Sequence, residues 1–156
     1  MYKLQLVIIT LLFSFTVGSS GATKNDRWER VKDIAFESPV QVSPSGYAIK
    51  LRLYYDKEMR IDLIISNTIT NGKNLCSILD VPNLPNFWDI NGRIISYKAE
   101  CVDDTVVIWP KFKNETKYII DEFLTKNIVH VGPTSIGTKG FVVAYGEVLS
   151  YSRYLN

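Results

Sequence analysis

The chain offers few side chains that are arranged for catalysis or metal binding. Its single histidine, His130, lies in the alternating run Val129-His130-Val131, and neither a serine-nucleophile motif nor a nucleotide-binding glycine loop accompanies it. Of the acidic pairs, Asp103-Asp104 suits a calcium site less well than an ordinary turn. We therefore expect a non-enzymatic protein without a metal site or a cofactor.

The remaining polar and aromatic side chains suit the recognition of a sugar. A sugar packs its apolar face on an aromatic ring, while a few placed polar groups hydrogen-bond its hydroxyls. The solvated face of a sheet ordinarily carries such charged residues as well, and tryptophan is more often part of a core. The candidate ligand-binding residues are Arg52, Arg60, Asp62, Asn67 and Trp88.

Most of these candidates belong to residues 47–67, around which the rest of the chain is organised. Two runs of alternating apolar and polar residues are joined there by the charged link Asp56-Lys57-Glu58. Alternation with a period of two is typical of half-buried strands, and the short link predicts an antiparallel hairpin. The solvent face of this hairpin is expected to carry Lys50, Arg52, Arg60 and Asp62.

Other short apolar runs are separated by turn residues and predict further strands. Asn91-Gly92 joins two such runs and favours a type I′ hairpin, because both turn positions need positive φ. Residues 25–36 fit either a short helix or an early edge strand, with Trp28 structural in both cases. Residues 121–127 could hold a turn of helix. Further strands are expected at 40–42, 75–81, 87–90, 93–101, 105–109, 118–120, 128–131 and 141–149.

This pattern predicts an all-β fold, an antiparallel jelly-roll-like β-sandwich of about ten short strands. The N-terminus predicts a secretory signal peptide over residues 1–19, with cleavage possible up to residue 22, because its apolar run is too short for a membrane anchor. A single domain is then expected over residues 23–150, followed by a fraying C-terminal tail at 151–156. The expected location is extracellular.

In a secreted protein, the two cysteines and one short motif predict covalent modifications. Cys76 and Cys101 are expected to form one disulfide in an oxidising compartment. Asn114-Glu115-Thr116 is an N-glycosylation sequon, which predicts Asn114 on an exposed turn. The formal net charge is +2 and no basic block stands out, so charge gives no reason to expect a nucleic acid or a membrane surface as partner.

The order of the motifs resembles a known group of β-sandwiches. IKLRLYY leads into MRIDLIISNTITNGK, and an aromatic hairpin, VVIW, IIDEFLTKNIVHVGP and GFVVAYGEV follow. This order resembles galectin-type, concanavalin-like jelly rolls, and it is similar to the farnesoic-acid-O-methyltransferase-like domain of invertebrate secreted proteins. The resemblance covers residues 46–148, and Ser66-Asn67-Thr68 lies where galectins place an Asn-containing turn at the galactoside site.

The resemblance implies a lectin-like domain without galactoside specificity or methyl transfer. The galectin His-Asn-Pro-Arg segment is absent, and so are the tryptophan and the Glu-Arg pair that follow the Asn turn in galectins. We expect a non-catalytic domain that binds a glycan or an extracellular protein, with carbohydrate recognition on a sheet face as the leading hypothesis. The alternative is a secreted interaction or structural module of CUB type, suggested by residues 140–145.

Overall fold

The computed structural model describes residues 26–32, 34–42, 46–67, 76 and 87–154. Their ten strands form one curled sheet in the order β1-β2-β4-β5-β8-β7-β6-β9-β10, with β3 paired to β4. Every pairing is antiparallel. The strands are β1 Glu29–Lys32, β2 Ala35–Glu37, β3 Gln41–Val42, β4 Tyr47–Asp56, β5 Glu58–Asn67, β6 Phe87–Ile90, β7 Arg93–Val102, β8 Thr105–Pro110, β9 Ile128–Val131 and β10 Thr134–Gly137.

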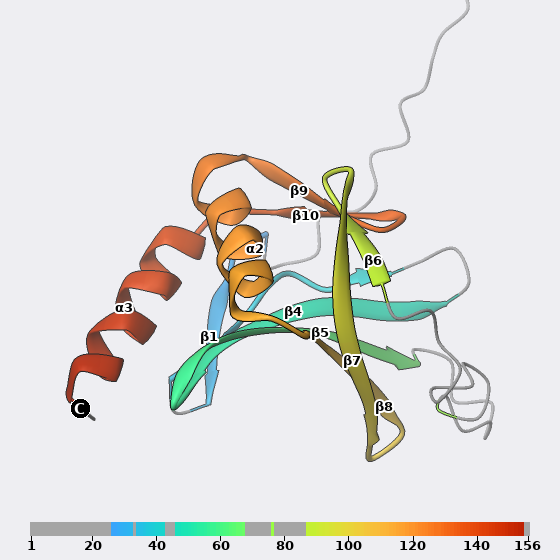
Figure 1. Cartoon of the computed structure of the whole chain (residues 1–156), viewed down its shortest axis with the longest axis horizontal. Helices are drawn as coiled ribbons and strands as arrows, with labels where there is room; N and C mark the ends of the chain where they lie inside the picture. The colour runs from blue at the N-terminus through green and yellow to red at the C-terminus, as the bar shows by residue number, and fades with distance from the viewer. Residues whose placement is uncertain (1–25, 33, 43–45, 68–75, 77–86, 155–156) are drawn as a thin grey trace, which may run out of the picture.

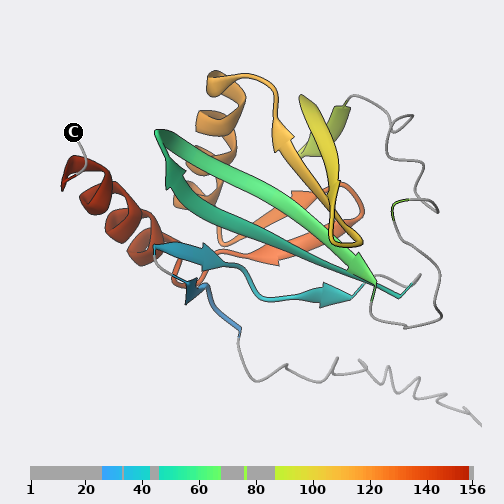
Figure 2. The ribbon, with the colours of Figure 1, turned by 90° about the horizontal axis from the view of Figure 1, so that it is seen from below.

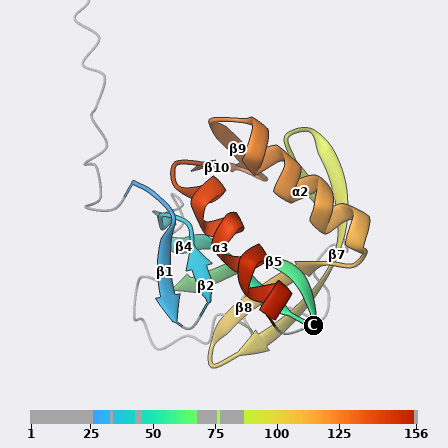
Figure 3. The same cartoon turned by 90° about the vertical axis from the view of Figure 1, so that its left-hand side faces the viewer.

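Two helices, α2 (Lys113–Thr125) and α3 (Phe141–Tyr154), lie against the inner side of the curl. They stand between the β4–β5 hairpin and the β9–β10 hairpin (Figure 1, Figure 3). The predicted antiparallel, β-rich architecture of about ten strands is confirmed and is consistent with a β-sandwich. Of the two helices, only a single turn within residues 121–127 was predicted, and it overlaps the end of α2.

The predicted central hairpin is confirmed and crosses the whole molecule (Figure 2). β4 and β5 pair without interruption from Tyr47 opposite Asn67 to Asp56 opposite Glu58. Only Lys57, with φ 58°, lies between the strands, so the link is shorter than the three-residue one predicted. The core side of the hairpin buries Leu51, Leu53, Ile61 and Leu63.

Two tight turns confirm the hairpins that follow. Asn91 and Gly92, with φ 49° and 83°, join β6 to β7, as the type I′ prediction requires. Asp103 and Asp104, with φ 46° and 60°, join β7 to β8 in the same manner. Asp103-Asp104 therefore forms the ordinary turn that the sequence favoured, since aspartate tolerates the left-handed region.

The strand predicted at residues 118–120 is wrong, because these residues lie inside α2. The helix buries Ile119, Ile120 and Phe123 along one side. The spacing of three and four residues to Phe123 is helical, whereas the adjacent isoleucines alone had suggested a strand. Glu115 fixes its first turn, since its carboxylate accepts the backbone N–H groups of Ser96, at 2.9 Å, and Phe112, at 3.2 Å. The helix begins well before the residues 121–127 expected to hold one turn.

The strand predicted at residues 141–149 is also wrong, because they form α3. Phe141, Ala144 and Val148 are fully buried at helical spacing, whereas the intervening Val142 is 62% exposed. The β-branched residues favour a strand only weakly, and packing of the buried stripe against β4 and β5 outweighs that preference. α3 continues through Tyr154, so residues 151–154 are helix and not a tail.

Trp28 confirms its predicted structural role at the N-terminal end of the fold. Its indole is 4% exposed and meets the rings of Phe123 and Phe141 at centroid distances of 5.4 and 4.8 Å. Its Nε1–H donates to the carbonyl of Gly137 at 3.2 Å, which ties it to β10. Of the two alternatives for residues 25–36, the edge strand holds, because β1 and β2 pair there.

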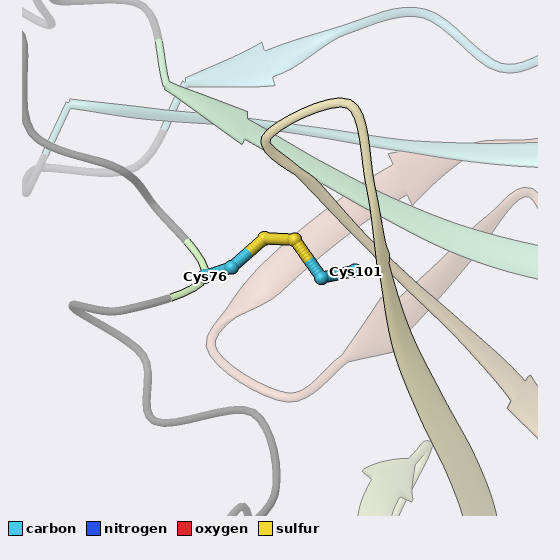
Figure 4. The surroundings of a disulfide bond; sticks show 2 residues. All are labelled: Cys76 and Cys101. Atoms are coloured by element: carbon cyan, nitrogen blue, oxygen red, sulfur yellow. A yellow bond between two sulfur atoms is a disulfide. The ribbon is translucent and has the colours of Figure 1, made fainter.

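The predicted disulfide joins Cys76 to Cys101 of β7 (Figure 4), and their Cα atoms are 5.9 Å apart. The other residues of the strand predicted at 75–81 lie outside the described residues, as does the predicted signal peptide at 1–19. Over the part of the chain that is described, neither helix has the length and apolarity needed to cross a membrane.

Candidate functional site

A groove of about 520 Å³ opens where strands β5 and β8 diverge. β5 pairs with β8 only from Leu63 opposite Ile108 to Ile65 opposite Val106, whereas its first half pairs with β4 alone. The space between them is bordered by β7, by the start of α2 and by Tyr145 of α3. We call this the β5–β8 groove.

The β5–β8 groove gathers two of the five predicted ligand-binding residues, Arg60 and Asp62. Arg52 stands opposite Asp62 in the sheet, but its guanidinium turns to Glu37 of β2, which accepts hydrogen bonds of 2.9 and 2.5 Å from it. Arg52 therefore holds two strands together and does not line the groove. Asn67 is the last residue of β5, and its side chain is outside the described part.

Trp88, the fifth candidate, lies on β6 and does not line the groove. Its half-buried ring packs on Tyr97 with the centroids 5.9 Å apart. Within the described residues its indole N–H has no hydrogen-bond partner. The aromatic side chains that line the groove are instead the half-buried Trp109 of β8, Phe112 and Tyr145.

The prediction that the carboxylate of Asp62 faces solvent is wrong, because the residue is only 5% exposed. Its Oδ2 accepts a hydrogen bond of 2.7 Å from the hydroxyl of Tyr54. Its Oδ1 lies 3.5 Å from Nη2 of Arg60 and has no hydrogen-bond partner among the described residues. Burial raises the pKa of Asp62, although Tyr54 and Arg60 act against that rise.

Arg60 is held between two aromatic rings at the side of the groove. The central carbon of its guanidinium lies 5.6 Å from the ring centroid of Tyr54 and 5.4 Å from that of Trp109. These are cation–π distances, and its side chain keeps 27% exposure. Because its position is fixed before a ligand arrives, the planar guanidinium can bind a carboxylate or sulfate at low entropic cost.

Sequence reasoning missed four lysines that line the groove: Lys98, Lys111, Lys113 and Lys117. Lys113 pairs with Glu58 at 2.6 Å, and Lys117 pairs with Asp121 at 2.6 Å. Within the described residues, neither Lys98 nor Lys111 has a carboxylate partner. The close spacing of the lysines at 111, 113 and 117 was a signal in the sequence that could have revealed a basic surface.

His130 does not assemble into a recognisable catalytic group. Its Nδ1 lies 2.9 Å from Oγ of Ser135 across the exposed face of the β9–β10 hairpin. The side-chain oxygen of Asn91 accepts from the backbone N–H of His130 and does not orient the ring. Within the described residues, no acidic side chain bonds the ring, so the third member of a triad is missing from this site. The described residues likewise contain no group of three or more metal-ligating side chains.

Asn114 is exposed, as the sequon predicted, but it lies in the first turn of α2 and not on a turn between strands. Its sequon partners have separate roles, since Glu115 is buried and Thr116 lines the β5–β8 groove. A glycan on Asn114 would therefore begin beside the groove.

No protein-family model matches this chain, and no curated protein and no solved structure matches it. The chemistry of the β5–β8 groove is therefore the observation on which a function must rest.

Proposed function

We propose that this protein is a secreted, non-catalytic domain that recognises a carbohydrate in the β5–β8 groove. The observation that carries the proposal is the pairing of the half-buried Trp109 ring with the guanidinium of Arg60, 5.4 Å away. An indole next to a planar donor is the combination that a sugar ring and its hydroxyls require.

The groove has the dimensions and the rigidity that this role needs. Its volume of about 520 Å³ falls within the range of ordinary ligand pockets, about 300–1,000 Å³. Arg60 stands on β5, which pairs with β4 along its whole length, and Asp62 and Tyr54 hold the guanidinium from the sheet side. A site that is already formed loses little conformational entropy when it binds a ligand.

The disulfide supports the extracellular setting. Cys76 and Cys101 are joined, and such bonds persist in oxidising compartments. Together with the predicted signal peptide at residues 1–19, this pairing supports export from the cell.

The proposal is tested with the purified mature protein on a glycan array, followed by titration of the best ligand. Trp109→Ala should weaken binding by about tenfold or more, equal to at least about 1.4 kcal/mol, because the sugar loses its aromatic platform. Tyr154→Ala is the matched control, since Tyr154 is 88% exposed on α3, away from the groove. Circular dichroism checks that both variants fold. Absence of binding to every glycan would refute the proposal.

A second candidate function is a secreted protein-interaction module, and the surface of α3 favours it. Val142, Val143 and Tyr154 are 62%, 63% and 88% exposed there, and they line one open surface together with Ile34. Exposed apolar clusters of this kind commonly bind proteins. The test is a pull-down from extracellular material with the wild type, a Val142→Ser/Val143→Ser variant and Trp109→Ala. A partner lost only with the double valine variant would support this candidate, whereas a partner retained by all three would contradict it.

A further inference from the structure

The charges of the side chains that line the β5–β8 groove do not sum to zero. Five cations line it, and three carboxylates accompany them. This surplus of two positive charges is as large as the formal net charge of the whole chain, +2. The cations are Arg60, Lys98, Lys111, Lys113 and Lys117, and the carboxylates are Glu58, Asp62 and Asp121.

The surplus positive charge belongs to two of the four lysines. Lys113 and Lys117 have carboxylate partners at 2.6 Å, so their charges are largely balanced. Lys98 and Lys111 have none within the described residues. An unbalanced charge that lines a concave surface attracts counter-ions more strongly than the same charge on a flat surface.

The two unbalanced lysines are neighbours of Trp109. Lys98 pairs directly with Trp109 across the β7–β8 ladder, so their side chains leave the same face of the sheet with Cβ atoms about 5 Å apart. Lys111 follows Trp109 by two residues, and its backbone N–H donates to the carbonyl of Ser96 on β7 at 2.9 Å, which fixes the chain there. Lys98 is therefore the direct cross-strand neighbour of the indole, and Lys111 lines the same groove with its ammonium 5.5 Å from the ring centroid of Phe112.

Arg60 adds a third positive group with free hydrogen-bonding capacity. A guanidinium carries five N–H donors, and among the described residues the only carboxylate near that of Arg60 is Asp62, whose Oδ1 lies 3.5 Å away. That approach is too long for a strong hydrogen bond. Oδ1 of Asp62 in turn is buried and has no hydrogen-bond partner among the described residues, which marks this end of the groove as incompletely satisfied.

We infer that the β5–β8 groove binds an acidic saccharide, one whose carboxylate or sulfate group lies on Arg60, Lys98 and Lys111 while the sugar ring packs on Trp109. The inference rests on the proposed function and adds the charge of the ligand to it. A carboxylate and a sulfate group both present two or more negatively charged terminal oxygens. A guanidinium and two ammonium groups can donate hydrogen bonds to these oxygens. A nucleic acid fits less well, because its backbone requires a long basic stripe and not a single groove with a surplus of two charges.

The inference is tested by titrating the mature protein with short oligosaccharides of equal length: one neutral, one carboxylated and one sulfated, with single-stranded DNA as a further polyanion. At least one acidic saccharide should bind about tenfold or more tightly than the neutral one, as a single charge-assisted hydrogen bond of at least about 1.4 kcal/mol would give. Its affinity should fall between about 0.1 and about 1 M salt, where the Debye length shrinks from about 10 to about 3 Å.

The Lys98→Gln/Lys111→Gln variant should lose most of this preference while it keeps its weak binding to the neutral saccharide. The charge-matched control is Lys32→Gln/Lys126→Gln. Lys32 lies on β1 and Lys126 caps the C-terminal end of α2, and both are exposed and do not line the groove. The control variant should bind as the wild type does. The carboxylated and sulfated probes then show which acidic group the groove takes.

The possible failures are distinguishable. Equal binding of neutral and acidic saccharides, unchanged in the Lys98→Gln/Lys111→Gln variant, would overturn the inference and leave the proposed function standing. Failure of every saccharide to bind would overturn both. Binding of single-stranded DNA as tightly as the best acidic saccharide, with the same loss in the variant, would show a general polyanion site and would also overturn the inference.

Discussion

Asp62 should give the folding stability of this protein a pH dependence of unusual sign. The residue is 5% exposed, and its burial raises its pKa above the ordinary value. Asp62→Asn is the suitable perturbation, because asparagine has nearly the same shape and cannot ionise. Its side-chain oxygen can still accept the hydrogen bond that Tyr54 donates at 2.7 Å.

The sign follows from where the protons bind. In the unfolded chain Asp62 titrates near its ordinary pKa of about 3.9, and in the folded protein it titrates at a higher pH. Between the two values the folded state holds more protons than the unfolded state, so the free energy of unfolding falls as the pH rises. The contribution of Asp62 is complete below the unfolded pKa and is lost as the pH rises through the folded pKa. The slope that one such group can contribute does not exceed about 1.4 kcal/mol per pH unit.

The measurement is urea unfolding of the wild type and Asp62→Asn, followed by tryptophan fluorescence without reducing agent, from about pH 4 upward. The wild-type free energy of unfolding minus that of the variant should decrease with rising pH and then level off. At neutral pH the variant should be at least as stable as the wild type. The ion pair that it loses is long, at 3.5 Å, and the buried charge costs desolvation energy.

Glu37→Gln is a control with the opposite sign. Burial alone would raise the pKa of Glu37, but the hydrogen bonds from Lys50 and Arg52 outweigh it and lower the pKa. The stabilisation from Glu37 is therefore present above its unfolded pKa and is lost as the pH falls through the folded one. The wild-type advantage over Glu37→Gln should grow with rising pH. A flat or rising difference for Asp62→Asn would refute the account of Asp62.

Three further predictions concern the packing and the crosslink. Trp28→Ala should lower the free energy of unfolding by about 3–5 kcal/mol and shift the urea midpoint accordingly, because the indole fills the space between two phenylalanine rings; an unchanged midpoint would contradict this packing. Glu115→Ala should cost about 1–3 kcal/mol and speed hydrogen exchange at the amide of Ser96, whereas Glu115→Gln, which can still accept, should cost less; equal exchange in both variants would argue against the contact. Peptide mapping without reduction should recover Cys76 linked to Cys101, and reduction should cost about 3 kcal/mol for the 25-residue separation; two free thiols would exclude the bond.

Features that depend only on neighbouring residues could be predicted from the sequence. Asn91-Gly92 and Asp103-Asp104 form turns because their own backbone preferences admit positive φ. The alternation over residues 47–67 determined the hairpin, since a period of two leaves one face for the core. The two cysteines of the chain were enough to predict their pairing.

The helices needed tertiary contacts that no local pattern supplies. Residues 141–149 have the β-branched and aromatic composition of a strand, yet Phe141, Ala144 and Val148 pack together only when the segment is helical and lies against the sheet. In α2, Glu115 fixes the first turn through Ser96, which lies on a strand 19 residues earlier. These partners lie outside the segment concerned, so the local sequence alone does not predict the helix.

The candidate site shows the same division. Alternation placed Arg60 and Asp62 on one face of β5, which holds in the structure, and it also predicted that both would be solvated. Asp62 is buried because Tyr54 and Arg60 contact it, and Lys98 meets Trp109 only through the pairing of β7 with β8. The sequence determined which side chains share a strand face, because backbone geometry is local. The burial of these side chains and the charges and residues around them depend on segments that are distant along the chain, so they follow from tertiary packing.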